Sequence, residues 1–517
     1  MQERDYSNLA DIIRPVSGAP RDKVMLIYRD QRISYAEMDR RASQLANWLI
    51  ARGVGKGDRV ALLARNSATY MTIIFAIAKA GGIATLVNWR LSAREVDYIA
   101  ADAEPVLLLV EHGLDELATG ARAQAIAQVG FEDLDAPQFD ADLASVDDED
   151  PAVPGDREDT ALLIYTSGTT GHPKGAMISH GNLVRHCGLE QSAVPRWLGV
   201  ETDEVCLAGL PLFHIGGLEL LLRPIFTGAT VVLHRDVDIE RMLVDFERYK
   251  VTMAGLVPTV LQMMLEHPGS LDVDFSHLDK FLYGAAPIPL PLLKEGLERM
   301  RCRFIQSYGM TEAAGSFVML SPDDHVDPDS PRLRSAGRPT FDTEVRILDE
   351  AGNDLPTGEI GEVAIRARAI MQGYWRNPIA TAEVKDGEGW LRTGDAGYLD
   401  ADGYVYVADR VKDMIQSGAE NIYPAEVESA IFGHPAVAEV AVVGRPDPKW
   451  GETVHAVIAT RLGMEATAEE IIAWARQRIA TYKAPRSVEF IEALPKNATG
   501  KILRREVRAR VRAANSG

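Results

Sequence analysis

The sequence predicts an α/β protein that has a large N-terminal domain of mixed α/β subdomains and a small C-terminal α+β domain. Two observations carry this prediction: helical and strand patterns alternate through most of the chain, and the pattern changes near residue 410. The length of 517 residues also exceeds that of a typical single domain. A composition of 46% hydrophobic and 25% charged residues is typical of globular proteins and excludes disordered and fibrous classes.

The first elements show the alternation. Between Met38 and Leu49 apolar residues recur at helical spacing, and Gly53 follows as a C-cap, so residues 34–53 predict a helix. The next segments predict a buried strand, a helix ended by glycines, and a second strand, in residues 58–65, 70–82 and 105–113. Alternating units of this kind predict a largely parallel sheet with helices on its faces.

The C-terminal part differs from what precedes it. Residues 403–410 (GYVYVADR) alternate as in a β-ribbon and lead into the sequence DRVKD. Beyond it, strands are expected in residues 436–446 and 454–460, and a helix in residues 468–480. We therefore place a domain boundary at residues 410–413, between a large domain of residues 1–409 and a small one of residues 414–517.

Charge and cysteine content restrict the class of partner and the compartment. The net charge of -20 argues against nucleic acid as the main partner. Cys187, Cys206 and Cys302 form no CxxC pair, which indicates neither a disulfide framework nor a zinc site. Residues 1–16 lack the apolar core of a signal peptide, and no apolar run is long enough to span a membrane. The final residues, AANSG, are not a peroxisomal signal, so a cytoplasmic location is expected.

Residues 165–175 (YTSGTTGHPKG) suggest a phosphate-binding loop. The glycines let backbone N–H groups approach an anion, and Lys174 adds a cation that can reach outer phosphates. The residues that would contribute amides, hydroxyls and the cation are Thr166, Ser167, Gly168, Thr169, Thr170, Gly171, Lys174 and Gly175. The spacing is not that of a Walker A loop, because the lysine is followed by glycine. A nucleoside triphosphate is the expected ligand, and a simple glycine- and serine-rich linker is the alternative.

Four further motifs follow in order: QSYGMTE at 306–312, GWLRTGD at 389–395, VADRVKDMI at 407–415 and PKNATGKILRR at 495–505. Together with the phosphate loop, they resemble the adenylate-forming superfamily, which includes acyl-CoA synthetases, aryl-CoA ligases, luciferases and peptide synthetase adenylation domains. The resemblance extends from about residue 30 to residue 505. It implies that a carboxylate attacks the α-phosphate of ATP to give an acyl-adenylate. A thiol, usually that of coenzyme A, then displaces AMP.

The resemblance also implies a role for each matched residue. The loop ending at Lys174 would hold the β- and γ-phosphates, and Thr311 would bind the α-phosphate. Glu312 would bind Mg²⁺, which offsets phosphate charge. Asp395 and Arg410 would bind the ribose. The adenine site would be lined by Gly284, Ala285, Ala286, Gln306, Ser307, Tyr308 and Gly309.

Lys501 is implied to be the catalytic lysine, because a positioned ammonium stabilises charge on the oxygens between carboxylate and α-phosphate. The C-terminal domain is implied to be a mobile lid that rotates about Lys412, within the hinge 410–413. After this rotation, in the state that forms the thioester, a loop that contains Gly418 and Ala419 would line the channel for the pantetheine arm of CoA. Many relatives have a second glycine where this chain has Ala419. The identity of this residue therefore affects whether CoA is the thiol that accepts the acyl group. Thioester formation is still expected.

The acyl pocket is expected between residues 211–222, 283–289 and 308–317. His214 resembles the residue that borders the substrate carboxylate, and Leu218, Leu220 and Phe317 would supply apolar walls. Amino-acid-activating relatives carry an aspartate here, but this chain has Phe213, His214 and Ile215, which favours an apolar acid, fatty or aryl-aliphatic. The arginines of residues 504–512 are interpreted as a solvated helical face.

The expected protein is thus an ATP- and Mg²⁺-dependent acid–CoA ligase, whose catalytic set is Lys501, Thr311, Glu312 and His214. It would use a small-molecule carboxylic acid and CoA, and act as a monomer or homodimer. One alternative keeps adenylation and loads a carrier-protein thiol, and a luciferase-like oxygenase is another. A catalytically silent nucleotide- or acyl-binding protein is the alternative from a different class.

Overall fold

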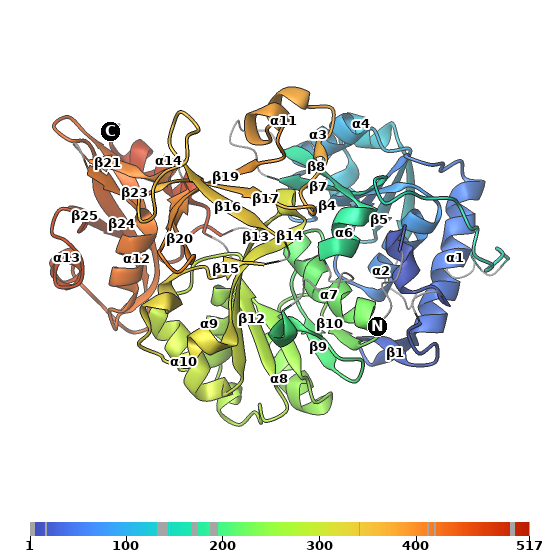
Figure 1. Cartoon of the computed structure of the whole chain (residues 1–517), viewed down its shortest axis with the longest axis horizontal. Coiled ribbons are helices and arrows are strands. Elements are labelled where there is room, and N and C mark those ends of the chain that lie inside the picture. Colours follow the sequence, from blue (N-terminus) through green and yellow to red (C-terminus); the bar gives the residue numbers. More distant parts are fainter. Residues whose placement is uncertain are drawn as a thin grey trace.

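The computed structural model describes residues 6–15, 18–131, 143, 145–166, 173–186, 195–340, 342–410, 413–417, 420–496 and 502–515. These residues form four β-sheets, which run from the N-terminal half at the right of Figure 1 to the C-terminal part at the left. Hydrophobic residues beneath the two largest sheets share one core, while the C-terminal sheet has a core of its own around Ile422, Val442 and Ile458.

The largest sheet has nine strands in the order β15-β14-β13-β12-β11-β9-β10-β1-β2. From β13 to β1 all neighbouring strands are parallel, and antiparallel strands lie at both edges. The strands are β1 (Val24–Tyr28), β2 (Gln31–Ser34), β9 (Val205–Ala208), β10 (Thr230–Leu233), β11 (Met253–Leu256), β12 (Lys280–Gly284), β13 (Arg303–Met310), β14 (Gly315–Leu320) and β15 (Arg338–Pro339).

A second sheet has seven strands in the order β18-β8-β7-β4-β3-β5-β6, and its central pairs are parallel. The strands are β3 (Arg59–Leu63), β4 (Ile83–Val87), β5 (Leu107–Glu111), β6 (Ala127–Phe131), β7 (Thr160–Thr166), β8 (Lys174–Ser179) and β18 (Gly373–Tyr374). The predicted parallel sheet with flanking helices is therefore confirmed, although it is divided between two sheets.

Two smaller sheets complete the fold. The sequence analysis did not predict the antiparallel sheet formed by β16 (Glu344–Leu348), β17 (Gly361–Arg366), β19 (Leu391–Leu399) and β20 (Val405–Arg410). The C-terminal sheet contains β21 (Ile415–Ser417), β22 (Glu420–Ile422), β23 (Val437–Asp447), β24 (Gly451–Thr460) and β25 (Ser487–Phe490). The C-terminal strands expected near residues 440 and 457 are thus confirmed. The division at residues 410–413 stays a prediction.

Helices cover the sheets and pack their apolar faces against them (Figure 1). They are α1 (Tyr35–Ala51), α2 (Ala68–Lys79), α3 (Ala93–Ala103), α4 (Ala121–Gln124), α6 (His180–His186), α7 (Ile215–Thr227), α8 (Ile239–Arg248), α9 (Pro258–Glu266), α10 (Leu290–Met300), α11 (Pro378–Val384), α12 (Pro424–Phe432), α13 (Ala468–Arg476) and α14 (Arg504–Asn515). The helix predicted over residues 34–53 is confirmed as α1. Ser34 caps its first turn, and Gly53 follows it at a φ of 87°. Only glycine adopts such a backbone conformation without cost.

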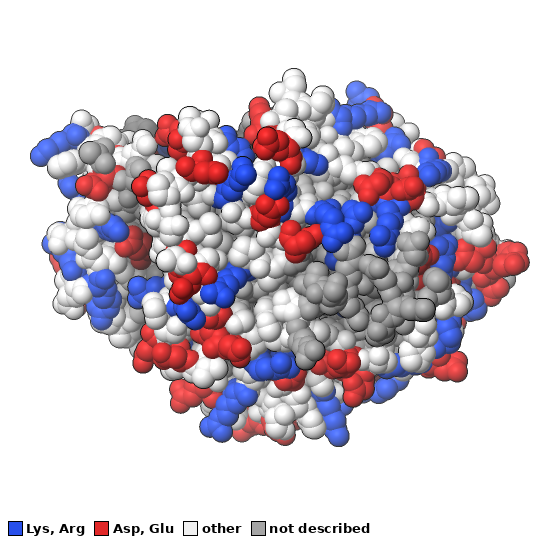
Figure 2. All heavy atoms as spheres, in the orientation of Figure 1, with Lys and Arg blue, Asp and Glu red and all other residues white. Residues whose placement is uncertain are grey.

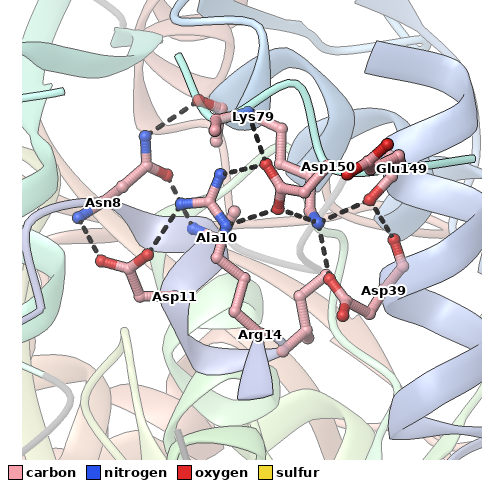
Figure 3. Close-up of polar contacts among 12 residues, drawn as sticks. Asn8, Ala10, Asp11, Arg14, Asp39, Lys79, Glu149 and Asp150 are labelled. Carbon is pink, nitrogen blue, oxygen red and sulfur yellow. Dashed lines mark hydrogen bonds and ion pairs between the residues drawn. The ribbon is translucent and has the colours of Figure 1, made fainter. Parts of the chain in front are cut away.

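A largely buried cluster of charges fixes the N-terminal segment to neighbouring helices and to the loop before β7 (Figure 3). The fully buried ammonium of Lys79 lies 2.5 Å from Asp39 Oδ1 and 2.7 Å from Asp150 Oδ2. Arg14 also pairs with Asp150, at 2.7 Å, and with Asp11, at 2.8 Å. These ion pairs hold down the pKa of Asp150 in spite of its partial burial. The cluster connects α1, α2, the N-terminal segment and the loop before β7.

Charges of both signs are interspersed over the face shown in Figure 2, so the net negative charge does not form one patch there. Cys206 and Cys302 are free thiols, and Cys187 lies outside the described residues. Within the described parts of the chain, no helix has the length and apolar composition that crossing a membrane requires.

Candidate active site

A cleft of about 3220 Å³ runs between the nine-stranded sheet, the second sheet and the C-terminal elements. Most of the predicted site residues that the structure describes line this cleft. They are Thr166, Lys174, His214, Gly284, Ala285, Ala286, Gln306, Ser307, Tyr308, Gly309, Thr311, Glu312 and Asp395. The strands β12 and β13 end at it, as expected for ligand sites at the carboxyl edge of a parallel sheet.

Several other predicted residues cannot be placed in this way. Ser167, Gly168, Thr169, Thr170, Gly171, Lys412, Gly418, Ala419 and Lys501 lie outside the described residues. Arg410 ends β20, and its backbone is opposite that of Asp395 on β19, but its side chain is not described. The roles of all these residues stay predictions.

The strands β7 and β8 bracket the phosphate loop, and Thr166 is opposite Lys174 in their antiparallel register. From the short helical turn Thr311–Ala313, Glu312 accepts two hydrogen bonds at Oε1: one from Thr166 at 3.1 Å and one from Tyr374 at 2.9 Å. The Lys174 ammonium lies 5.1 Å from the centre of the Tyr374 ring. Tyr374, which sequence reasoning did not single out, therefore contacts both a cation and a carboxylate.

The predicted adenosine end of the cleft is formed by β12, β13 and β19. Tyr308 donates a hydrogen bond to Asp395 Oδ2 at 2.6 Å, and its ring meets Phe317 edge-on at 4.6 Å. Ala285 has a φ of 61°, a left-handed conformation that is rare for alanine and turns the chain sharply after β12. Tyr308 is half-buried and lines the cleft, so it is not simply a core residue.

His214 stands at the N-terminus of α7, and its ring packs 4.5 Å from that of Phe213. Its Nε2 is buried and accepts or donates no hydrogen bond with any described residue. Burial, with a smaller contribution from Arg90, lowers the pKa of His214 to about 4. The imidazole is therefore neutral near pH 7, and its ring nitrogen is available to a ligand in the cleft.

The apolar wall differs in part from the prediction. Leu220 lines the cleft as expected, together with Ile215 and Val257. Leu218 and Phe317 instead lie in the hydrophobic core behind the wall. Because Leu218 is two positions from Leu220 on α7, its side chain points away from the face that carries Leu220.

A buried polar group that sequence reasoning missed also borders the cleft. Glu219 on α7 accepts hydrogen bonds from the backbone N–H of Ser316 at 3.2 Å and from its hydroxyl at 2.8 Å. The same carboxylate pairs with His186 at 3.0 Å and with Arg223 at 2.9 Å. Glu219 therefore has its oxygens occupied, and it is not the carboxylate that would bind a substrate ammonium.

The interpretation of the C-terminal arginines as a solvated face is wrong for two of them. Arg504, at the start of α14, pairs with Asp409 of β20 at 2.8 Å and with Glu428 of α12 at 2.5 Å. Arg508 pairs with Asp413 at 2.7 Å. Arg510 does match the prediction: its side chain is 56% exposed and contacts Glu489. Helical periodicity predicts a polar face, but it does not show which part of that face meets another element.

Comparison with known proteins identifies the family. The sequence profile named AMP-binding enzyme matches residues 14–375, and the profile of the AMP-binding enzyme C-terminal domain matches residues 426–501. The chain belongs to the AMP-binding enzyme family. It is 42% identical over 479 residues to a feruloyl-CoA synthase from an Amycolatopsis species, with 92% of this chain and 94% of the relative covered.

Two other relatives support the same assignment. This chain is 39% identical over 483 residues to the fatty acid–[acyl-carrier-protein] ligase ScoC of Streptomyces coeruleorubidus, with 92% of this chain and 91% of the relative covered. The crystal structure of the anthranilate CoA ligase AuaEII in complex with anthranoyl-AMP superposes with a TM-score of 0.91, at 30% identity and over 100% of both chains. The ligase is an AMP-forming acid–thiol ligase that uses ATP and transfers the acyl group to CoA.

Proposed function

We propose that this ligase activates an apolar carboxylic acid, fatty or aryl-aliphatic, and that Mg²⁺ assists the ATP step. One observation carries the proposal: a single cleft joins Lys174 and Glu312 to Tyr308 and Asp395, and then to the apolar wall around His214. The volume and lining of this cleft suit a triphosphate, a nucleoside and an uncharged acyl group bound together. The names of the feruloyl-CoA synthase and fatty acid ligase relatives agree with these two acid classes.

The metal is proposed to bind through Glu312. Both of the described hydrogen bonds to its carboxylate go to Oε1, which leaves Oε2 without a hydrogen bond from any described residue. A carboxylate oxygen is a good ligand for Mg²⁺, which usually takes one or two carboxylates together with substrate phosphates. The described residues contain no group of three or more potential metal ligands, which fits a metal held largely by phosphate. Bound Mg²⁺ would neutralise phosphate charge.

The acid would lie with its carboxylate near His214. A neutral imidazole with an unoccupied, buried Nε2 can hydrogen-bond a carboxylate oxygen without adding the charge that would hold the carboxylate too tightly. Thr311 would bind the α-phosphate, and Lys501 would approach as charge develops on the oxygens of the transition state. Asp395 and Arg410 would hold the ribose, and Lys412 would be the hinge of the rotation that admits the thiol.

Gly418 and Ala419 would line the channel for pantetheine. The match to a carrier-protein ligase supports a second candidate, in which the same arm is presented by a protein. Both thiols carry the same pantetheine chemistry, so the two candidates differ only in what surrounds the channel mouth.

An assay of pyrophosphate release tests the proposal. Short, medium and long fatty acids, benzoates, cinnamates and several amino acids would each be supplied with Mg²⁺-ATP, with and without CoA. We expect one apolar class to lead and turnover to require CoA. A leading amino acid would contradict the proposed pocket. Turnover of an apolar acid only with a carrier protein would favour the second candidate, and Ala419→Gly would then be tested for CoA use.

A further inference from the structure

The amide of Asn66 lies behind the loop that carries His214. Asn66 follows β3 and precedes α2, and only 4% of its surface is exposed. The loop, residues 210–214, connects β9 to α7, and most of its residues line the cleft, whereas Asn66 does not. Any effect of Asn66 on the reaction would therefore pass through the loop that it holds.

Three hydrogen bonds fix this amide. Its Oδ1 accepts from the backbone N–H of Leu212 at 2.9 Å, and its Nδ2 donates to the carbonyl of Leu210 at 2.9 Å. Nδ2 also donates to the carbonyl of His234, directly after β10, at 3.1 Å. Both donors and the oxygen are thus satisfied. The reversed amide would place its oxygen against two carbonyls, so the chemistry fixes the orientation.

Pro211 explains why the loop needs a side-chain partner. It has no backbone N–H to donate, and it restricts Leu210 before it to extended backbone. The backbone groups on either side of it still need partners, because Leu212 is fully buried and an unpaired buried N–H or C=O is costly. The amide of Asn66 serves both of its flanking residues, as a neighbouring strand would.

The loop also rests directly on the first turn of α7. A Cβ on Gly217 would lie 2.2 Å from the carbonyl oxygen of Pro211, so the close approach depends on the missing side chain. The N–H of His214 donates to the Pro211 carbonyl at 3.2 Å, and the carbonyl of His214 accepts from the N–H of Gly217 at 3.1 Å. The backbone of His214 is therefore held both by α7 and, through the loop, by Asn66.

Asn66 also connects the two large sheets. It follows β3 of the seven-stranded sheet, and its hydrogen bonds reach the segments that follow β9 and β10 of the nine-stranded sheet. All three strands pair in parallel with their neighbours, so the amide lies where the carboxyl edges of both sheets meet. A shift of one edge against the other would move the loop and His214 with it.

We propose that Asn66 is a positioning residue for His214, and through it for the carboxylate of the acid during adenylation. This inference rests on the proposed function, which places that carboxylate beside His214. The three hydrogen bonds of the Asn66 amide go to Leu210, Leu212 and His234, none of which is proposed to bind ATP. Asn66 therefore acts on the acid and leaves nucleotide binding unchanged.

The first test is Asn66→Ala, assayed by pyrophosphate release with the preferred apolar acid. We expect kcat/KM for the acid to fall by at least about tenfold, a loss that displacement of a reacting group by about 1 Å can produce. The KM for ATP should stay within about twofold of the wild type. A KM for ATP that rises as much as the acid term falls would overturn the inference.

Asn8→Ala is the matched control. Asn8 is 2% exposed, donates to the carbonyl of Ala78 at 2.9 Å and accepts from the N–H of Ala10 at 2.8 Å, outside the cleft (Figure 3). The loss of this buried amide should change kcat/KM for the acid by less than about twofold. An equal fall in both variants would overturn the inference, because any buried amide would then have the same effect.

A double-mutant cycle with His214→Ala separates positioning from a general loss of stability. If Asn66 acts through His214, then Asn66→Ala should cost less than about twofold once the imidazole is absent. The same fold loss in both backgrounds would overturn the inference.

Asn66→Asp keeps the test decisive if the alanine variant does not fold, since it preserves the size of the side chain and the acceptor for Leu212. Its carboxylate would face two carbonyl oxygens, and protonation would restore one donor. Relative to the wild type at the same pH, its kcat/KM should therefore rise at least about threefold from pH 8 to pH 6. A constant ratio would overturn the inference.

All of these adverse outcomes leave an active ligase and the proposed function intact. Failure of the proposed function is distinguished by the absence of pyrophosphate release from the wild type with every apolar acid.

Discussion

At the scale of single residues, the carboxylate of Glu312, which we propose to bind Mg²⁺, is held in place by two hydrogen bonds. Thr166 comes from the strand before the phosphate loop and Tyr374 from an edge strand of the same sheet, and both donate to Oε1. Two donors on one oxygen fix the plane of the carboxylate. The position of the other oxygen is then defined as well, which would favour metal binding because less motion is lost on binding.

Replacing Tyr374 by phenylalanine should weaken the metal step selectively. The ring beside Lys174 stays, but one hydrogen bond to a charged group is lost, which corresponds to about a tenfold fall in kcat/KM for adenylation. The Mg²⁺ concentration for half-maximal rate should rise. Tyr398→Phe is the control, because Tyr398 also lines the cleft but stacks on Tyr406. An unchanged Mg²⁺ requirement in Tyr374→Phe would refute the positioning role.

Lys501 gives a second prediction at this scale. Lys501→Ala should reduce adenylate formation by at least about a hundredfold, because a positioned charge in a dry site contributes several kcal/mol to transition-state stabilisation. Thioester formation from supplied acyl-adenylate and CoA should stay within a few fold of the wild type. Rapid-quench measurement of the two half-reactions checks this. Equal loss in both would show that the lysine does not act in one state alone.

At the scale of elements, α14 is attached more firmly than its sequence indicates. Arg504 begins this helix three residues after Lys501, and it connects α14 to α12 and β20 through Glu428 and Asp409. Its side chain is 20% exposed, and breaking such a pair leaves carboxylates without their partner. We therefore expect the role proposed for Lys501 to depend on Arg504.

Arg504→Ala should lower the rate of adenylation by at least about tenfold, a loss that displacement of a catalytic group by about 1 Å can produce. The effect on thioester formation from supplied adenylate should be smaller. Arg510→Ala, on the exposed side of the same helix, should change either rate by less than about twofold. If both variants behave alike, the attachment of α14 does not position the lysine.

The elements also show what could be predicted from the sequence. The helix α1 carries a clear helical periodicity, and the strands β3, β5, β23 and β24 contain apolar runs, so their positions were predicted closely. The site motifs were likewise recognisable, because each is local. The link between Glu219 and Ser316 spans 97 positions, and that between Glu312 and Tyr374 spans 62. Partners so far apart are brought together by the sheets, and no local pattern in one sequence encodes such a pair.

At the scale of the whole molecule, two buried histidines make stability depend on pH. Burial lowers the pKa of His180, which accepts a hydrogen bond from the backbone N–H of Leu9, to about 4. The pKa of His214 is lowered to a similar value by burial. An unfolded histidine titrates near 6.5, so between pH 6.5 and 4 the unfolded chain binds protons that the fold excludes. Their contribution to stability is complete above pH 6.5 and falls as the pH drops to 4.

The free energy of unfolding should therefore fall between pH 7 and pH 5, by about 2 kcal/mol for each of these histidines. In His180→Gln the fall should be smaller by about that amount, since glutamine does not titrate. His112→Gln is the control for replacement of a histidine at an exposed position, since the His112 side chain is 43% exposed. Urea unfolding at the two pH values measures this. An identical pH dependence in all three proteins would contradict the assignment.

The C-terminal elements contact α9 (Figure 1). This contact affects the relative rates of the two half-reactions, adenylation and thioester formation, if it favours one orientation of the C-terminal domain. Arg461, after β24, pairs with Glu266 at the end of α9 at 2.5 Å, and Gln262 of the same helix donates to the carbonyl of Ala438 at 3.5 Å. If the C-terminal domain rotates between the steps, these contacts belong to one orientation only. The pair is partly exposed, so it is worth about 1 kcal/mol or less.

A charge reversal tests this argument. Arg461→Glu should disfavour the present orientation, and the rates of the two half-reactions should move in opposite directions by about two- to fivefold. Glu266→Arg combined with Arg461→Glu restores opposite charges and should return both rates towards the wild type. These substitutions change the fraction of molecules in which the C-terminal domain has this orientation, and they do not change the acyl pocket. The preferred acid should therefore stay the same in every variant. Rates that fall together, or a double variant no better than the single one, would show that this contact does not select an orientation.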